Sequence, residues 1–304
     1  MISVGFDPAF IDTVVRAEDE QGNLMPELPK PGYHHRRSTI TRVAGGNAVN
    51  VAYVLKKLGN DINLVIPSNN LFDELLKQKG MECVHRIHET VNETVAVAWE
   101  PGEIQFNQVI GEIGSKHYTE SIHKYWTQSP IHIMVNWGLN YQSHEWISCL
   151  WLASCGWNYE EIDEIKSTVI DHAIETDNLQ HKLVLEPGGI LEHPKQEVLH
   201  NLLSRMAETS HDNLYPVFLC NEEEDKIFAE YNFHSKIIHT SQRVICWNAG
   251  TKQVYEVPQL KQIKTFVGAG DSFLAGIVHE LYQNNRLAPS YAISVAQKYM
   301  TNTL

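Results

Sequence analysis

The sequence lacks the features of a membrane or secreted protein. Its 304 residues contain no apolar run close to the roughly 20 residues that a membrane helix needs. The first residues, Met1–Asp7, lack the basic start and the long apolar stretch of a signal peptide, and they favour a buried strand instead. We therefore expect a cytoplasmic protein with no membrane partner.

Paired cysteines and basic charge are also scarce. The five cysteines form no C-x-x-C pair, which argues against a disulfide framework or a structural zinc site. The formal net charge of −13 argues against a nucleic-acid partner, because such proteins use basic patches to displace counterions. Histidine is abundant, with 16 residues, but no H-E-x-x-H pair occurs, so we interpret most of them as surface or core residues.

Short apolar runs alternate with helical patterns along the whole chain. The runs suit strands of a parallel sheet and lie at Ile2–Phe6, Ile62–Ile66, Ile131–Val135, Leu183–Leu185, Pro216–Leu219 and Val244–Cys246. Helices are predicted at Asn47–Leu58, Leu71–Gln78, His144–Ser154, Tyr159–Ile174, Lys195–Ala207, Glu222–Tyr231, Asp271–Tyr282 and Pro289–Met300. This alternation predicts an α/β fold with a doubly wound, mostly parallel sheet and helices on both faces. We expect one domain over residues 1–304.

Two regions break this rhythm. Thr94–Trp99 and Ile104–Val109 alternate in polarity around Glu100–Glu103, which is a hairpin signal. The stretch Glu18–Thr41 is rich in Pro and Gly and then becomes β-prone. Together they predict a small β sheet, at about residues 13–42 and 90–110, that stands off the main domain. It would serve as a lid over a cleft or as a surface decoration.

The segment Gly268–Gly276 carries the clearest chemical signal. Two glycines before a helical pattern make a turn whose backbone N–H groups converge at a helix N-terminus, which is an anion site. No Gly-Lys-Ser/Thr follows, so it is not a Walker A loop, and Phe273 replaces the third glycine of a dinucleotide fingerprint. The turn places the carboxylate of Asp271 beside the anion site, which is the pairing that phosphoryl transfer to a hydroxyl needs. An ordinary N-capping Asp would give the same local pattern.

A second glycine turn, Gly45-Gly46, enters a helix near the other end of the chain. Such a turn lets the backbone come close to a ligand. Asn50 lies one turn into the helix, and its amide can both donate to and accept from vicinal hydroxyls. A helix capped by Asn would look the same.

Together the two segments resemble the ribokinase-like (PfkB) family of carbohydrate and nucleoside kinases. The pattern G-G-x-x-x-N-x-A-x-x-L-x-x-L-G is matched from Gly45 to Gly59, and G-A-G-D-x-F from Gly268 to Phe273. Asn221-Glu222-Glu223-Glu224 is similar to the family's N-x-x-E element. Asp12 resembles its substrate-binding Asp at a spacing about two residues longer, and Asp7 competes for that role. The two irregular β regions resemble the family's lid.

The resemblance implies a kinase that moves the γ-phosphoryl group of a nucleotide, by default ATP, to a hydroxyl of a sugar, sugar phosphate or nucleoside. It implies Asp271 as the catalytic base, with the phosphoryl charge stabilised by Gly268, Ala269 and Gly270. The implied substrate contacts are Asp12, Gly45, Gly46 and Asn50. The implied nucleotide and phosphate contacts are Asn221, Glu224, Trp247 and Gly250. Glu224 would also hold Mg²⁺ indirectly, through water.

Departures from the family pattern leave parts of this assignment open. Thr265-Phe266-Val267 stands where relatives usually carry Asp-Thr-x, which puts activation by potassium in doubt. The adenine-side turn, typically V-T-x-G-x-x-G, corresponds to Val244–Gly250, where Trp247 would stack on a base or pack in the core. A phosphorylated substrate would suit the basic residues near the lid, Arg36, Arg37 and Arg42.

Two alternative functions and one oligomeric state complete the expectations. A sugar- or nucleoside-binding protein on the same fold, without phosphotransfer, is the runner-up. An NAD-dependent enzyme is disfavoured, because no glycine fingerprint follows the first strand. A homodimer through the lid is compatible with the alternating hairpin pattern.

Overall fold

The computed structural model describes most of the chain. The described residues are 1–5, 7–28, 30, 38–82, 85–86, 90–99, 102–108, 129–140, 145, 147–148, 150–151, 182–190, 193–209, 216–229, 231–260, 263, 265 and 267–304. The predicted helix Tyr159–Ile174 lies outside them, as do Arg36, Arg37, Phe266 and the centre of the hairpin turn, while the helix His144–Ser154 is described only in part.

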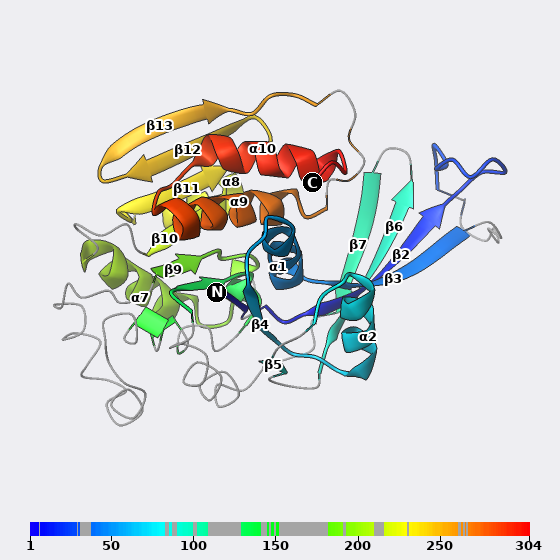
Figure 1. Cartoon of the computed structure of the whole chain (residues 1–304), viewed down its shortest axis with the longest axis horizontal. Helices are drawn as coiled ribbons and strands as arrows, with labels where there is room; N and C mark the ends of the chain where they lie inside the picture. The colour runs from blue at the N-terminus through cyan, green and yellow to red at the C-terminus, as the bar shows by residue number, and fades with distance from the viewer. Residues whose placement is uncertain are drawn as a thin grey trace.

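The larger of the two described sheets has nine strands, in the order β13-β12-β11-β10-β9-β8-β1-β4-β5 (Figure 1). Seven strands are parallel: β1 (Ile2–Gly5), β4 (Ile62–Ile66), β5 (His85–Arg86), β8 (Ile131–Met134), β9 (Lys182–Leu185), β10 (Val217–Asn221) and β11 (Ser235–His239). Two antiparallel strands, β12 (Arg243–Asn248) and β13 (Thr251–Glu256), complete one edge. The predicted, mostly parallel sheet is confirmed.

One strand differs from its prediction. The run Val244–Cys246 belongs to β12, which pairs antiparallel with both of its neighbours rather than joining the parallel strands. Because β12 lies one strand from the sheet edge, only Val244 and Cys246 are fully buried, whereas Ile245 is half-buried. A short apolar run shows that a strand is present but does not give its direction.

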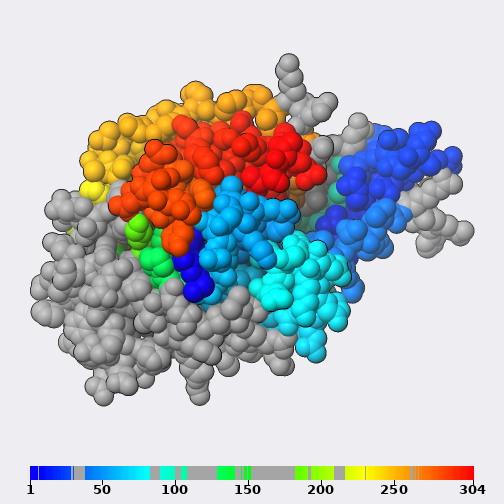
Figure 2. All heavy atoms as spheres, in the orientation of Figure 1, coloured from blue at the N-terminus to red at the C-terminus, as the bar shows by residue number. Residues whose placement is uncertain are grey.

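Helices cover both faces of the large sheet, as a doubly wound fold requires. One face packs against α1 (Asn47–Lys57), α2 (Asn70–Gln78), α9 (Ala269–Asn284) and α10 (Pro289–Met300). The other face packs against α7 (Gln196–Thr209), α8 (Glu222–Phe228) and the side chains of Ile147, Leu150 and Trp151. Figure 2 shows α1, α9 and α10 side by side on the first face. Among the described helices, none is long and apolar enough to span a membrane.

Several of these helices begin at residues that favour a helix N-terminus. Asn69 caps α2 by accepting a hydrogen bond from the backbone N–H of Phe72 (2.9 Å). Pro289 occupies the first turn of α10, where a missing N–H costs nothing. In α1 the buried residues recur at helical spacing and include Ala48, Val51 and Leu55, so this helix packs one apolar face on the sheet.

The second sheet has four described strands and projects from the large sheet (Figure 1). Its order is β3 (Ser38–Gly45), β2 (Phe10–Ala17), β6 (Asn92–Trp99) and β7 (Gly102–Gln108). The hairpin β6–β7 matches the prediction, whereas β2 begins before the predicted lid region. The predicted small sheet is therefore present.

Of the five cysteines, Cys220 and Cys246 lie in the described part of the chain and are free and buried. Cys220 packs with the core beneath α7 and α8, and Cys246 packs on the opposite face. Both therefore act as small apolar side chains, as the sequence predicts.

Candidate active site

The glycine turn before α9 has the conformation of an anion site. Gly268 is the N-cap of α9 in the left-handed region (φ 81°), which glycine adopts readily. Its carbonyl accepts from both the backbone N–H (2.9 Å) and the hydroxyl (2.7 Å) of Ser272, which fixes the turn on the helix. Asp271 lies in the first turn of α9, so its carboxylate is near the positive end of the helix dipole.

The two glycine motifs meet in space. The amide nitrogen of Asn50 on α1 donates a hydrogen bond of 2.9 Å to the carboxylate of Asp271, across 221 residues of sequence. This contact is possible because α1 and α9 pack together on the same face of the sheet. Burial raises the pKa of Asp271 to about 6, while Asn50 and the charge of Lys79 oppose that shift.

Each glycine of the Gly45-Gly46 turn makes room for a carboxylate. Gly45 is the last residue of β3, and a Cβ there would overlap the carboxylate of Asp12 on the neighbouring strand β2. At Gly46 (φ 94°), a Cβ would lie 2.6 Å from Oδ2 of Asp7. The glycine pair therefore lets two aspartates approach the start of α1.

Asp7 and Asp12 have different surroundings, although their charges interact. Asp7 is fully buried, accepts a hydrogen bond from the backbone N–H of Ala48 (2.8 Å) and receives another from the Asn136 amide (3.2 Å). Burial raises its pKa to about 7, and the charges of Asp271 and Asp12 add to the shift. Asp12 is half-buried, so of the two it is the one whose carboxylate a ligand can reach.

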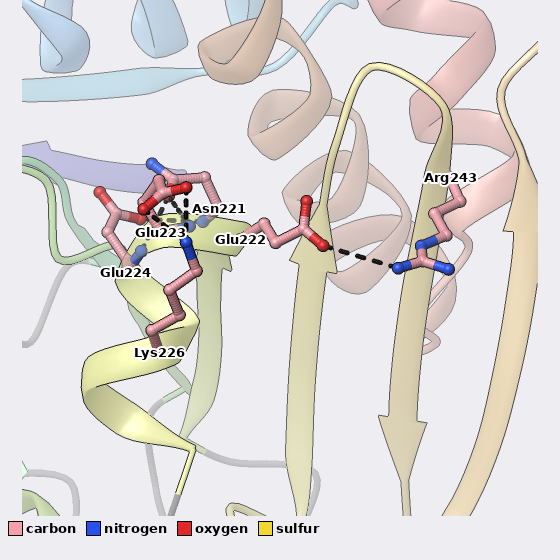
Figure 3. Close-up of polar contacts among 6 residues, drawn as sticks. All are labelled: Asn221, Glu222, Glu223, Glu224, Lys226 and Arg243. Atoms are coloured by element: carbon pink, nitrogen blue, oxygen red, sulfur yellow. Dashed lines mark hydrogen bonds and ion pairs between the residues drawn. The ribbon is translucent and has the colours of Figure 1, made fainter.

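The N-x-x-E segment is held by a reciprocal cap at the end of β10. The side chain of Asn221 accepts from the backbone N–H groups of Glu223 and Glu224 (2.9 Å each), and Glu224 accepts from the backbone N–H of Asn221 (2.8 Å). Figure 3 shows this cap together with the contact between Glu222 and Arg243 on β12 (3.5 Å). Glu224 is thus oriented, while Glu222 is exposed.

Glu186 is a site residue that the sequence analysis missed. It follows β9, and its carboxylate accepts from the backbone N–H of Asn136 (2.8 Å), whose side chain in turn reaches Asp7. Burial raises the pKa of Glu186 to about 8, with a further contribution from the charge of Glu224. The signal was a carboxylate directly after a buried strand, at the edge of a parallel sheet where ligands bind.

The donor set of Glu186 and Glu224 fits a hard divalent cation. Both residues are partly buried, and burial raises the pKa of each carboxyl group, so a positive charge between them would be stabilising. Each carboxylate accepts a hydrogen bond from a backbone N–H, which helps to fix its position. No group of three side chains that could hold a metal ion occurs among the described residues.

Two predicted nucleotide contacts, Trp247 and Gly250, do not reach this edge of the sheet. Asn248 pairs with Ser235 at the start of β11, and the N–H of Ala249 donates to His234 (3.0 Å). The turn that contains Gly250 therefore lies at the amino ends of the parallel strands, opposite Asp271. Trp247 is half-buried under the ammonium group of Lys252, 5.1 Å from its ring centroid.

The carboxyl end of β11, which does lie at the site edge, carries His239 and is followed by Thr240. A Cβ at Gly270 would lie 3.4 Å from Cε1 of His239, whose ring also contacts Phe273. Burial lowers the pKa of His239 to about 4, so the imidazole is neutral. The hydroxyl of Thr240 accepts from the backbone N–H of Arg243 (3.0 Å), which closes a tight turn before β12.

On the other side of the glycine turn lies Tyr299 of α10. Its hydroxyl would be 3.0 Å from a Cβ at Gly268, and its pKa is raised by burial and by the charge of Asp271. The turn is thus flanked by His239 at one end and by Tyr299 at the other. Neither residue was among the sequence candidates, because both come from elements without a motif.

Comparisons with known proteins identify the fold. Scans of protein-family models and of curated protein sequences find no match. Among solved structures, the chain is similar to a nucleoside kinase from Methanocaldococcus jannaschii, described as an archaeal member of the ribokinase family. The TM-score is 0.62 at 13% identity, over 99% of this chain and 91% of that one.

Two further solved structures give the same result. The nucleoside kinase of Burkholderia thailandensis in complex with inosine has a TM-score of 0.64 at 12% identity, covering 99% of this chain and 91% of that chain. A ribokinase from Thermotoga maritima has a TM-score of 0.61 at 14% identity, covering 100% and 95%. Nearly whole-length similarity at such low identity establishes architecture alone: this chain has the ribokinase-like fold.

Proposed function

We propose that the chain is a PfkB-type kinase, which transfers the γ-phosphoryl group of a nucleotide, with ATP as the expected donor, to a hydroxyl of a sugar, sugar phosphate or nucleoside. The hydrogen bond between Asn50 and Asp271 carries the proposal, because it unites the two sequence motifs at one partly buried point. There a carboxylate lies beside the N–H groups of a glycine turn, as phosphoryl transfer to a hydroxyl requires.

Asp271 is the proposed base. With a pKa of about 6 it is ionised at neutral pH, yet it is basic enough to accept a proton from a hydroxyl as that oxygen attacks phosphorus. Asn50 holds the carboxylate in one orientation and keeps the other side of its amide for the acceptor. Turnover would therefore fall as pH drops through about 6 and the base becomes protonated.

The acceptor would lie between the two sheets. Asp12, at the foot of the small sheet, and Asn50, at the start of α1, would hold its hydroxyls, with Gly45 leaving room for the Asp12 carboxylate and Gly46 for that of Asp7. The small sheet would act as a lid that excludes water during transfer. Arg42 does not favour a phosphorylated acceptor, because it is exposed and alternates to the opposite face from Asp12, as their strand register shows.

The phosphoryl donor would occupy the edge formed by β10, β11 and the start of α9. Backbone N–H groups of residues 268–271 would stabilise the charge of the transferring group. Residues 240–243 replace Trp247 and Gly250 as the expected contacts for the rest of the nucleotide. Mg²⁺, which would offset phosphate charge, would be held by Glu186 and Glu224, partly through water.

The test is a matrix of donors against acceptors. ATP, GTP and ADP would be combined with pentoses, hexoses, their phosphates and nucleosides, with and without potassium. We expect turnover with at least one pair, and a loss of about 10²–10⁴-fold in Asp271→Asn, because the base is removed while its shape is kept. Acceptor binding should survive in that variant, as measured by calorimetry.

The exposed Asp61 provides a matched control, since Asp61→Asn makes the same chemical change away from the site. It should keep full turnover. Near-normal turnover in Asp271→Asn would show that the base is another group. Acceptor binding with no nucleotide binding in the wild type would favour the binding-protein alternative.

We also propose that a second copy of the chain covers the outer face of the small sheet. Ile40, Val95, Ile104 and Phe106 are 40–64% exposed there, and Val95 pairs directly with Phe106. An exposed apolar patch of this kind indicates a protein interface. Sedimentation should show a dimer in the wild type and a monomer in Phe106→Glu, whereas a monomeric wild type would refute the interface.

A further inference from the structure

We propose that His239 is a catalytic residue of the phosphoryl site: a ring nitrogen of its imidazole donates a hydrogen bond to the terminal phosphate of the nucleotide at residues 268–271. The inference rests on the proposed function and deepens it, because it adds a side-chain donor to the backbone N–H groups of the glycine turn. The direction of the side chain, its distance from the turn and its rigid strand support this assignment.

His239 lies on the face of the large sheet that packs against α9. It is the last residue of β11, and side chains alternate between the two faces along a strand. Ile237 packs in the same core as α9, whereas Ile238 packs in the core beneath α7 and α8. His239 therefore shares the face of Ile237, and its ring contacts Phe273 of α9 at a centroid distance of 5.5 Å.

The polar edge of this ring faces the glycine turn. A Cβ at Gly270 would lie 3.4 Å from Cε1 of His239. Cε1 is the ring carbon bonded to both Nδ1 and Nε2, so the two nitrogens flank the atom that is close to the turn. Among the described residues, none hydrogen-bonds to either nitrogen, which leaves the ring N–H for a ligand.

Gly270 supplies a backbone donor beside the ring. The carbonyl of Gly268, the N-cap of α9, accepts from the N–H of Ser272 (2.9 Å), so the N–H of Gly270 precedes the first helical hydrogen bond. Gly270 is exposed and His239 is half-buried, so both can be reached from solvent. A phosphate between them would accept from the helix N-terminus and from the imidazole together.

The backbone of His239 is fixed on both sides. His239 pairs with Asn221 of β10 and with Val244 of β12. The next residue, Thr240, closes the turn before β12 by accepting from the N–H of Arg243 (3.0 Å). Since Asn221 begins the N-x-x-E segment, His239 lies beside both that segment and the glycine turn. A donor on such a rigid element needs little reorganisation as charge develops on the transferring group.

The direct test is the affinity of the full chain for inorganic pyrophosphate with Mg²⁺, measured by calorimetry. His239→Phe keeps a ring against Phe273 but removes the N–H, and it should weaken binding about tenfold, as expected for one hydrogen bond to a charged group. His239→Asn and His239→Gln place an amide donor near the positions of Nδ1 and Nε2, so at least one of them should restore most of the affinity.

His279 provides the matched control. It lies toward the other end of α9 and also stacks on an aromatic ring, that of Tyr291, at a centroid distance of 5.5 Å. His279→Phe should leave pyrophosphate binding unchanged. Equal losses of affinity in the Phe, Asn and Gln variants of His239 would indicate a packing role and would overturn the inference.

The second measurement observes the imidazole itself. In protein labelled with ¹⁵N-histidine, pyrophosphate should shift the ring-nitrogen resonances of His239, assigned by their loss in His239→Gln, and leave those of His279 in place. Unshifted His239 resonances at saturation, or no pyrophosphate binding by the wild type, would refute the contact. Because neither measurement needs turnover, a failure of the proposed function would be distinguishable: the anion contact would be present without phosphoryl transfer.

Discussion

Two glycine-containing turns of this protein lie at opposite edges of the large sheet. Residues 268–271 lead into α9, and the sequence predicts that they stabilise the transferring phosphoryl group. Residues 247–250 join β12 to β13, and the sequence predicts nucleotide contacts there. The first lies at the carboxyl edge of the parallel strands, bonded to Asn50. The second closes the β12–β13 hairpin at the amino edge, beside His234. Strand direction, rather than glycine content, separates a ligand turn from a connection.

Substitution of Gly268 and Gly250 is the strongest test of this difference between the two turns. Gly268 and Gly250 both have positive φ (81° and 72°), so a Cβ strains each backbone. Only at Gly268 would the Cβ also meet a neighbour, the hydroxyl of Tyr299 at 3.0 Å. We expect Gly268→Ala to lower kcat by about 10²-fold, because the N–H groups of the turn move away from the transferring phosphoryl group.

Gly250→Ala is the matched control for that change. It should cost about 1–2 kcal/mol in the free energy of unfolding, from the backbone alone, and leave kcat unchanged. Denaturant unfolding and initial rates on both variants measure the contrast. Equal losses of kcat in the two variants would show that the glycine turns act through stability and not through position.

The smallest expected effect is at Trp247, and it sharpens the comparison. Trp247→Leu removes a half-buried ring that contacts Lys252, at the far end of the hairpin from the site. The KM for the nucleotide should stay within about twofold of the wild type, with at most a modest loss of stability. A tenfold rise in the KM for the nucleotide would show that Trp247 contacts the nucleotide base.

The strands and helices of the central core are well predicted, because burial on both faces leaves clear apolar runs. The predicted bounds of Ile62–Ile66 and Pro289–Met300 agree with β4 and α10. β11 and β13 were missed: β11 contains Lys236 and His239, and β13 is largely exposed, so neither gives a continuous apolar run.

Motifs predicted the parts of the candidate site that depend on local backbone shape. Gly46 and Gly268 stand where positive φ is needed, and Asn50 and Asp271 follow at fixed helical offsets. Glu186, His239 and Tyr299 reach the site only through sheet order and helix packing, which no local pattern encodes. The roles of all these residues remain proposals for the experiments above.

The hydrogen bond between Asn50 and Asp271 also limits when the site can form during synthesis of the chain. At about 5–20 residues per second, the 221 residues that separate them take roughly 10 to 45 seconds to synthesise. Throughout that interval the side of α1 that packs on α9 is uncovered. The contact that assembles the site therefore forms late, when most of the chain has been synthesised.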